Sequence, residues 1–410
     1  MTNKVVITGM GVITPIGNSI KEFWESLVEG KNGITYNDRI DTTNFQAKIA
    51  GLIKNFNPLD YIDKKHIRKM DRFVQIGLAS VDQALKDSSI NLNAVDPFRI
   101  GVFVGSGIGG IETFEEQVKT LIERGSDKVS PYFVPKMIVN ILSGWIGIIY
   151  NIRGPNLTYV SACSSSLHAI GEAYLSVKNG IVDIAIVCGS EAPIVKSAIA
   201  GFENMGALSK NNDPNRASRP FDLNRDGFVI AEGAGAIILE SLKNAQKREA
   251  KIYAEIVGYS HTCDAYHITA PDPEAKSIIH AISKTIENLD IQEIDYINAH
   301  GTSTPYNDKT ETYAIKSVLK DRAYKINISS TKSMIGHTLG AAGVIESITT
   351  VLSIYHQIVT PTINYHTPDP ECDLNYTPNK SIRREINIAL KNSFGFGGHN
   401  VVVAFKRFNY

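Results

Sequence analysis

Residues 154–171 read GPNLTYVSACSSSLHAIG, and this stretch decides how the chain folds. A Gly-Pro turn signal leads into extended residues, which end at a cysteine, Cys163. Serines are favoured at helix starts, and three of them follow the cysteine. Behind the serines, apolar residues recur on one face of a helix: Leu167, Ile170, Tyr174 and Val177. The sequence therefore predicts that Cys163 lies at, or just before, the first turn of a helix.

The predicted position of Cys163 has a chemical consequence. Unpaired N–H groups and the positive end of the helix dipole point at the first turn. Both favour the thiolate, which is the nucleophilic form of cysteine. Small neighbours, Ala162 and Ser164, leave room for a substrate. The other interpretation is a buried structural cysteine, the commoner fate of a free thiol, and this stretch alone leaves both open.

The global composition is that of an ordinary globular protein. The chain has 410 residues, enough for a large core or two fused domains, and its 42 Lys and Arg equal its 42 Asp and Glu. The near-zero net charge predicts no nucleic-acid or membrane-surface partner. The most apolar segment, Phe133–Tyr150, is interrupted by Pro135, Lys136 and Asn140. We therefore expect a buried or interface helix there rather than a membrane span.

Cysteine usage and the first residues bear on the compartment. The four cysteines are dispersed without a Cys-x-x-Cys pair, which argues against a zinc site or a disulfide framework. The N-terminal residues enter a strand pattern directly and lack the apolar segment and cleavage site of a signal peptide. These features predict a protein of the reducing cytoplasm that binds no metal.

Strands and helices alternate along the chain, which favours mixed sheets covered by helices. The predicted strands cover residues 5–8, 100–104, 183–188, 234–239, 252–257, 294–298, 326–330 and 401–405. The predicted helices include 19–28, a segment ending at 85, 242–250 and 275–289, and an irregular stretch runs from the strand at 252–257 through Pro273. Because the pattern starts again near residue 252, we predict an internal duplication, with halves at residues 1–250 and 251–410.

Two further motifs carry histidines. Residues 298–309 read NAHGTSTPYNDK, and His300 follows a predicted strand on a glycine turn. Residues 329–343 read SSTKSMIGHTLGAAG, and His337 precedes an Ala/Gly-rich helix. A lone histidine is more often a core or surface residue than a catalyst. Two histidines at strand-to-helix junctions, in company with a matching cysteine, favour a shared active site.

With these three motifs in this order, the chain resembles the β-ketoacyl-acyl-carrier-protein synthases of the condensing-enzyme superfamily, most closely the type II elongating synthases. The resemblance runs from VVITG at residues 5–9 to NSFGFGGHN at residues 392–400, nearly the whole chain. It implies a thiolase-like α/β fold, with two similar halves in a five-layer α/β/α/β/α arrangement. It also implies decarboxylative Claisen condensation, which extends an acyl chain by two carbons in fatty acid biosynthesis.

The resemblance assigns the catalytic roles. Cys163 would accept the acyl group as a thioester, which is covalent catalysis. His300 and His337, both neutral, would donate hydrogen bonds to the malonyl thioester oxygen as carbon dioxide leaves. The backbone N–H groups of Cys163 and Phe396 would form the oxyanion hole for the condensation step. Lys332 would stay cationic and orient the site.

The remaining roles follow from the same resemblance. Glu346 and Asp308 would support the site, although a structural salt bridge is an equal interpretation of Lys332 and Glu346. The residues expected to bind substrate are Thr302 and Thr304 on the phosphopantetheine arm, Phe394 and Phe396 in a gating loop, and Ile108 in the wall of the acyl pocket. The residues expected to dock carrier protein are Lys64, Lys65, Arg68 and Lys69, which otherwise form a solvated helix face.

The resemblance implies acyl carrier protein as the partner, in acyl and malonyl forms, and a homodimer. It implies no metal or organic cofactor, because phosphopantetheine arrives on the carrier. One feature differs: the run from Cys163 to Leu167, CSSSL, is more like modular polyketide ketosynthases. A second hypothesis is therefore a discrete polyketide or polyene ketosynthase. Such a protein could pair with a chain-length-factor-like subunit in a heterodimer. A third hypothesis is a non-catalytic subunit that binds carrier protein.

Overall fold

A computed structural model describes residues 3–409 of the chain. Ten of its strands form one sheet in the order β10-β9-β13-β14-β8-β1-β7-β6-β4-β5. The N-terminal strands are β1 (Val5–Ile13), β4 (Ile100–Gly105), β5 (Asn156–Tyr159), β6 (Ile184–Glu191) and β7 (Gly233–Ser241). The C-terminal strands are β8 (Ala254–Cys263), β9 (Ile294–Asn298), β10 (Asn327–Ser329), β13 (Ile388–Gly395) and β14 (His399–Lys406).

The strand order shows the duplication directly. If the five strands of each half are numbered 1 to 5 along the chain, each half-sheet has the order 3-2-4-5-1 when it is read from its outer edge inward. The pairings match as well: β4 is parallel to β5 and β6, and β9 is parallel to β10 and β13. The half-sheets join through a short antiparallel contact between Val5–Ile7 and Ala254–Ile256. The boundary predicted at residue 250 lies between α9 (Leu242–Lys247) and β8, and it stays a prediction.

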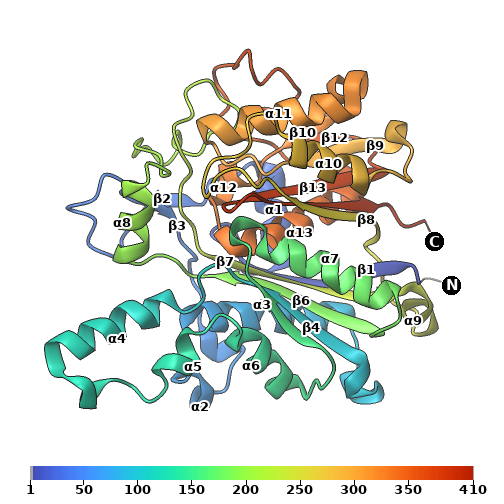
Figure 1. The fold of residues 1–410 in the computed structure, drawn as a ribbon. Helices are drawn as coiled ribbons and strands as arrows, with labels where there is room; N and C mark the ends of the chain where they lie inside the picture. Colours follow the sequence, from blue (N-terminus) through green and yellow to red (C-terminus); the bar gives the residue numbers. More distant parts are fainter. Residues whose placement is uncertain (1–2, 410) are drawn as a thin grey trace.

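Helices separate and cover the two half-sheets, as Figure 1 shows. The outer helices of the N-terminal half are α3 (Arg72–Ser88) and α6 (Ile141–Tyr150), and those of the C-terminal half are α10 (Lys276–Thr285) and α11 (Pro305–Leu319). Between the half-sheets lie α7 (Ser165–Lys178) and α13 (Ala342–His356). The layers are therefore α/β/α/β/α, which confirms the predicted five-layer arrangement.

The central helix α13 is buried on nearly every face, because sheets cover it on both sides. Every residue from Ala342 to Ile354 is buried. Glu346 is the one charged residue in that buried stretch, so it needs partners inside the protein. These partners turn out to come from both sides of the active site.

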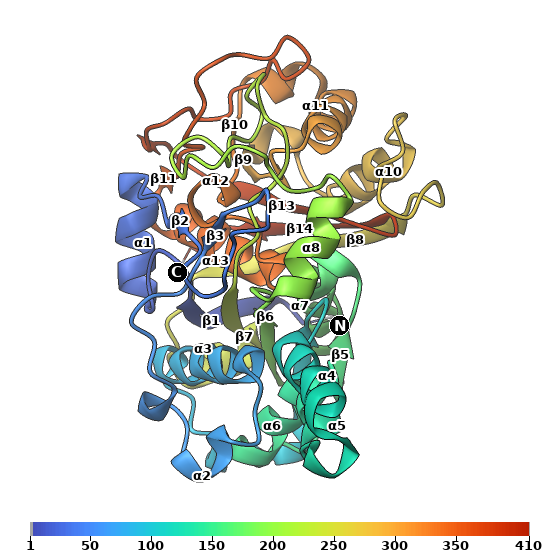
Figure 2. The ribbon, with the colours of Figure 1, turned by 90° about the vertical axis from the view of Figure 1, so that its left-hand side faces the viewer.

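The remaining described elements are short or lie at the periphery (Figure 2). The helices are α1 (Ile20–Glu29), α2 (Lys64–Ile67), α4 (Ile111–Arg124), α5 (Phe133–Met137), α8 (Lys196–Asn204) and α12 (Lys332–Ile335). The strands form two small pairs, β2 (Ile34–Tyr36) with β3 (Ile49–Gly51), and β11 (Ile358–Val359) with β12 (Ile382–Arg383). Among residues 3–409, no helix is both long and apolar enough to cross a membrane.

The structure corrects three predicted elements. Strand β1 does not end near Gly9 but continues to Ile13, and a Cβ on Gly9 would lie 2.3 Å from the carbonyl oxygen of Ala84 on α3. The glycine therefore serves close helix packing rather than a turn. Strand β8 runs on to Cys263 because β14 pairs with it along its length. The apolar segment 133–150 is not one helix but two, α5 and α6.

Candidate active site

Cys163 lies where β5 gives way to α7, within a single 3₁₀ turn formed by residues 162–164. This confirms the predicted position at the start of a helix. The face of α7 predicted to be apolar is buried, including Leu167 and Ile170. The residue before the cysteine, Ala162, has a φ of 50°, in the left-handed region that non-glycine residues seldom adopt. This turn aims the cysteine side chain away from its own helix and toward the C-terminal half.

The thiol of Cys163 is in a less ionising environment than the helix start predicts. Burial raises the pKa of Cys163 to about 12, and the charge of Lys332 and the backbone N–H of Phe396 oppose this only in part. The expectation that the resting cysteine favours thiolate is therefore wrong, because the side chain is 7% exposed and poorly solvated. The thiolate has to be stabilised by the groups that face it.

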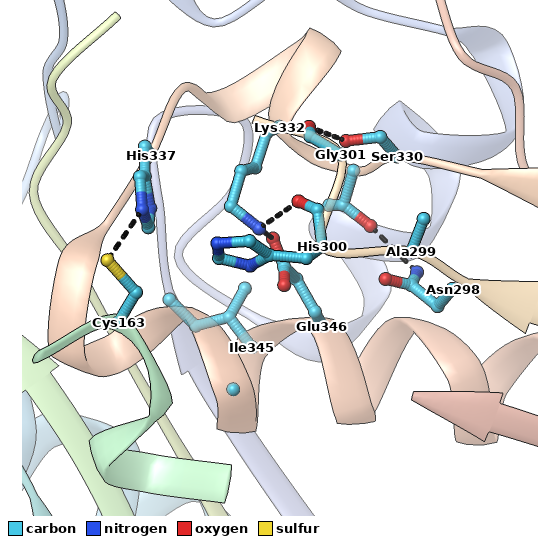
Figure 3. Close-up of polar contacts among 12 residues, drawn as sticks. Cys163, Asn298, Ala299, His300, Gly301, Ser330, Lys332, His337, Ile345 and Glu346 are labelled. Carbon is cyan, nitrogen blue, oxygen red and sulfur yellow. Dashed lines mark hydrogen bonds and ion pairs between the residues drawn. The ribbon is translucent and has the colours of Figure 1, made fainter. Parts of the chain in front are cut away.

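His337 faces the sulfur directly. Its Nε2 atom lies 3.0 Å from Sγ of Cys163 (Figure 3). The backbone N–H of Leu339 donates to Nδ1 at 3.2 Å, so Nδ1 is an acceptor and the proton of a neutral ring is on Nε2. In this tautomer His337 donates toward the sulfur and cannot take its proton.

His300 completes the group from the end of β9. Its ring centroid lies 5.6 Å from that of His337, and its Nδ1 atom is buried without a hydrogen-bond partner among the described residues. Burial, and next the charge of Lys332, hold the pKa of both His300 and His337 well below the usual range. Both rings are therefore neutral donors at pH 7.

Lys332, which is paired with Glu346, contacts His300 from the side away from the cavity, which neither of the two lines. Nζ of Lys332 donates to the carbonyl oxygen of His300 at 2.7 Å and to Oε1 of Glu346 at 2.6 Å (Figure 3). Both side chains are buried. The geometry fits orientation of His300, and the salt bridge is real as well, so the two interpretations of this pair coexist.

Cys163, His300 and His337 line a cavity of about 380 Å³, and residues from both halves of the chain form its wall. Of the predicted site residues, those that line it are Cys163, His300, His337, Ile108, Thr302, Thr304, Phe394 and Phe396. Lys332, Glu346 and Asp308 do not line it. Asp308 is buried elsewhere and accepts a hydrogen bond from the backbone N–H of Phe221 at 2.8 Å, so it anchors a loop.

The glycine-rich end of β13 approaches the cysteine turn closely. A Cβ on Gly395 would lie 2.7 Å from the carbonyl oxygen of Ser161 and 3.2 Å from the backbone nitrogen of Cys163. Only a glycine allows this approach. It brings the N–H of Phe396 to the sulfur. The two predicted oxyanion-hole groups, the N–H groups of Cys163 and Phe396, therefore lie on adjoining segments.

The ligand-type atoms of Cys163, His300 and His337 lie within 4.8 Å of one another. The same closeness is needed when a nucleophile and two hydrogen-bond donors converge on one substrate. The tautomer of His337 already accounts for both of its ring nitrogens. The three side chains therefore form the candidate active site.

The predicted docking residues lie on and beside α2, beneath α3 on the outer side of the N-terminal half-sheet (Figure 2). Lys64, Lys65 and Arg68 are exposed. Lys65 pairs with Asp63 at 3.0 Å, and Lys69 lies over the ring of Tyr132. None of these residues lines the cavity.

The buried charged residues at the site that escaped the sequence analysis include Glu311, Lys391 and Glu191, of which Glu191 accepts the backbone N–H of Ile108 at 3.0 Å. Glu311 accepts the backbone N–H groups of His300 and Gly301, each at 2.9 Å. Lys391 forms an ion pair with Oε2 of Glu346 at 2.8 Å. Only Lys391 leaves a signal in the sequence. Residues 388–398 read IALKNSFGFGG, so a lysine stands between the apolar residues IAL and the NSFGFGG motif.

Comparison with known proteins now decides the family. The model of the beta-ketoacyl synthase N-terminal domain matches residues 2–245, and that of the C-terminal domain matches residues 253–366. This chain belongs to the beta-ketoacyl synthase family. It is a condensing acyltransferase, as the sequence predicts.

Relatives along the whole chain refine this. The chain is 47% identical to 3-oxoacyl-[acyl-carrier-protein] synthase 2 of Synechocystis sp., over 99% of this chain and 98% of the relative. It is 49% identical to the protein of the same name from Staphylococcus aureus, with the same coverage. Among solved structures, a type II polyketide ketosynthase in complex with its acyl-carrier protein has a TM-score of 0.93 at 33% identity, with full coverage of both chains. The predicted thiolase-like fold is confirmed.

Proposed function

We propose that this synthase extends acyl chains by two carbons in fatty acid biosynthesis, with both substrates delivered as thioesters of acyl carrier protein. The observation that carries the proposal is the convergence of Cys163 Sγ, His337 and His300 at one end of the cavity. One nucleophile and two neutral donors are what acyl transfer followed by decarboxylation requires.

The first step transfers the acyl group. The Cys163 sulfur attacks the thioester carbonyl of the acyl-carrier protein, the bond to the carrier sulfur breaks, and the carrier leaves as a thiol with the cysteine proton. Three groups stabilise the developing thiolate: Nε2–H of His337, the N–H of Phe396 and the positive end of α7. They lower the barrier for a thiol whose resting pKa is high.

The second step breaks the carbon–carbon bond to the malonyl carboxylate. Carbon dioxide leaves, and the electron pair moves onto the thioester oxygen, where the two neutral histidines donate. The resulting enolate carbon attacks the acyl-Cys163 carbonyl, whose oxyanion is held by the N–H groups of Cys163 and Phe396. Collapse releases the β-ketoacyl-carrier protein and the Cys163 thiolate, which takes a proton from solvent to restore the thiol. The low pKa of His300 and His337 keeps both rings neutral at pH 7. This supports their assignment as neutral hydrogen-bond donors.

The test is intact mass spectrometry of the purified protein mixed with a panel of acyl-carrier proteins, followed by malonyl-carrier protein. We expect an acyl adduct on Cys163 and then a carrier product longer by two carbons. Carrier binding without any adduct would contradict the proposal and favour the non-catalytic subunit.

The same panel tests the polyketide alternative. Two observations favour that alternative: the CSSSL run at Cys163 and the structural likeness to a polyketide ketosynthase. The higher identity to the two 3-oxoacyl synthases favours fatty acid elongation. Extension of saturated chains supports elongation, whereas loading restricted to β-keto or polyene chains supports the alternative.

The acyl pocket makes a size prediction. Ile108 lines the cavity and packs with the apolar cluster that contains Phe202 and Leu339. Ile108→Phe fills part of this space, so kcat/KM for the longest accepted acyl chain is expected to fall about 10- to 100-fold, while the shortest chain is affected little. Ile108→Leu conserves volume and serves as the control. An unaltered chain-length profile in competition assays would remove Ile108 from the pocket wall.

Acyl carrier protein is the proposed partner, and the surface around α2 is its proposed docking site. Carrier proteins are acidic, so charge reversal at Lys65, Arg68 and Lys69 is expected to raise KM for the carrier about tenfold at low ionic strength. The difference should shrink as salt screens the charges.

The control reverses three exposed lysines far from α2 in Figure 1, namely Lys4 beside β1 and Lys243 and Lys247 on α9. An equal KM in both triple variants would return the α2 residues to a solvated helix face. No further cofactor is proposed, since the carrier brings the phosphopantetheine arm. All four cysteines are free, which fits a reducing compartment such as the cytoplasm.

A homodimer is proposed on the edge of the N-terminal half-sheet. Strand β5 is the last strand of the sheet, and Leu157 on it is 51% exposed. Ile148 on the adjoining α6 is 70% exposed. An apolar edge strand is a site for pairing with a second chain. Light scattering should return twice the 44.9 kDa of one chain, and a single-chain mass would contradict the dimer.

A further inference from the structure

A second lysine, Lys391, lies buried behind the two histidines, and none of the proposed steps touches it. It is the fourth residue of β13 and has no exposed surface. Its neighbour Leu390 packs into the outer core of the C-terminal half, so Lys391 projects to the other face of the sheet, toward α13. A fully buried lysine is rare unless it is paired, so its contacts have to explain it.

The Lys391 ammonium makes two hydrogen bonds and one ion pair. Nζ lies 2.8 Å from Oε2 of Glu346 and 3.2 Å from the carbonyl oxygen of Ala299, and it also donates to the carbonyl oxygen of Asn392. The two hydrogen bonds go to backbone oxygens on β13 and just past the end of β9, and the ion pair goes to the carboxylate on α13. The group is therefore held in one orientation.

These contacts clamp the backbone that carries His300. Lys391 donates to the carbonyl oxygen of Ala299, the residue before His300, and Lys332 donates to the carbonyl oxygen of His300 itself at 2.7 Å. Glu311 accepts the N–H groups of His300 and Gly301. The peptide groups on both sides of the histidine are thus fixed by buried charges rather than by solvent.

Glu346 couples the two lysines. Its Oε1 atom binds Lys332 at 2.6 Å and its Oε2 atom faces Lys391 at 2.8 Å. Because one carboxylate takes both ammonium groups, the angle at which it meets Lys332 depends on Lys391. The next residue on the strand, Asn392, donates to Glu311 at 3.0 Å, which ties the same strand to the other side of the His300 turn.

We propose that Lys391 is a positioning residue for decarboxylation: it orients Glu346 and the Ala299 carbonyl, and through them holds Lys332 and His300 in their working geometry. The inference rests on the function proposed above. It gives a role to a residue that the motifs of the sequence did not single out, and that role depends on both the contacts and the charge of the ammonium.

The charge acts on the imidazoles as well. Burial and Lys332 are the larger causes of the low pKa of His300 and His337, and Lys391 adds to both. Burial lowers the pKa of Lys391 to about 8, so the group is still mainly protonated at pH 7. The other ionisable groups around this site are Lys332 on α12, Glu346 on α13, Glu311 on α11, Cys163 before α7 and Glu191 at the end of β6.

Removing the positive charge of Lys391 is expected to raise the pKa of His300 and His337. A nearby positive charge lowers an imidazole pKa, so its removal raises that pKa. Protonation of His337 at Nδ1 removes the acceptor of the Leu339 N–H and with it the contact that orients the ring, and this would then occur at a higher pH than in the wild type. The acid limb of the decarboxylation rate is therefore expected to move upward when Lys391 loses its charge.

The experiment compares wild type, Lys391→Met and Lys391→Gln in three assays: acyl loading by intact mass, malonyl-carrier decarboxylation, and its pH profile. In Lys391→Met we expect normal loading, a kcat for decarboxylation lower by about 10- to 100-fold, and KM nearly unchanged. The acid limb should move to higher pH. Lys391→Gln keeps a neutral donor for Glu346, so it should recover part of kcat but keep the shifted limb.

The control is Lys406→Met, which removes an exposed lysine from the neighbouring strand β14, where it pairs with Glu293. If a folded Lys391→Met or Lys391→Gln variant matches the wild type in kcat and pH profile and differs only in melting temperature, Lys391 is purely structural and the inference fails. If Lys391→Met does not fold, Lys391→Gln decides. A wild type that neither loads nor decarboxylates contradicts the proposed function instead.

Discussion

Cys163→Ala is expected to abolish acyl loading and to lower the rate of condensation by at least about 10³-fold, because no other group can hold the acyl chain as a thioester. The sulfur is 3.0 Å from Nε2 of His337 and faces the N–H of Phe396. No other cysteine lines the cavity. Intact mass spectrometry after mixing with acyl-carrier protein measures loading, and product analysis measures condensation.

The matched control is Cys188→Ala. Cys188 is also buried, and burial also raises its pKa to about 12, but it lies within β6 and outside the cavity. The Cys188→Ala variant should therefore accept the acyl group on Cys163 as the wild type does. Decarboxylation of malonyl-carrier protein alone is expected to survive in Cys163→Ala, because that step uses the histidines. An acyl adduct on the Cys163→Ala protein would place the nucleophile elsewhere.

His300→Ala is expected to lower the rate of decarboxylation by about 10²- to 10³-fold while Cys163 still accepts an acyl group. The ring is one of two neutral donors at the cavity end, and its removal leaves the oxygen that gains charge with one donor, His337. Radiometric release of carbon dioxide from malonyl-carrier protein measures the first effect. Intact mass measures the second, so the two half-reactions separate in one variant.

The control for this variant is His356→Ala. Burial lowers the pKa of His356 too, but its ring stacks on Trp24 at the end of α13, away from the cavity. Its decarboxylation rate should be close to that of the wild type. If His300→Ala lost acyl loading and decarboxylation to the same extent, His300 would serve the structure of the whole site rather than one step.

The elements that the sequence predicts well are those whose signal is local. The helix after Cys163 follows from apolar spacing. Strand β9 is predicted at the residues where it is found, Ile294–Asn298, which include the strand-favouring residues Ile294, Tyr296 and Ile297. Both histidines were predicted as site residues because each follows a strand on a turn. The errors at β1 and β8 come from tertiary packing: α3 needs the glycine at position 9, and β14 extends β8 by pairing with it.

By itself, the sequence determined the duplicated α/β pattern, and it predicted the three side chains to which we assign the chemistry, since each of these signals is written in neighbouring residues. Only the tertiary structure decided how they act. Folding brings Cys163 and His337 into contact across 174 positions of sequence, and it buries the thiol so that its pKa rises rather than falls. It also places Lys391 against Glu346, because burial and long-range charge are properties of the packed layers, which no local pattern encodes.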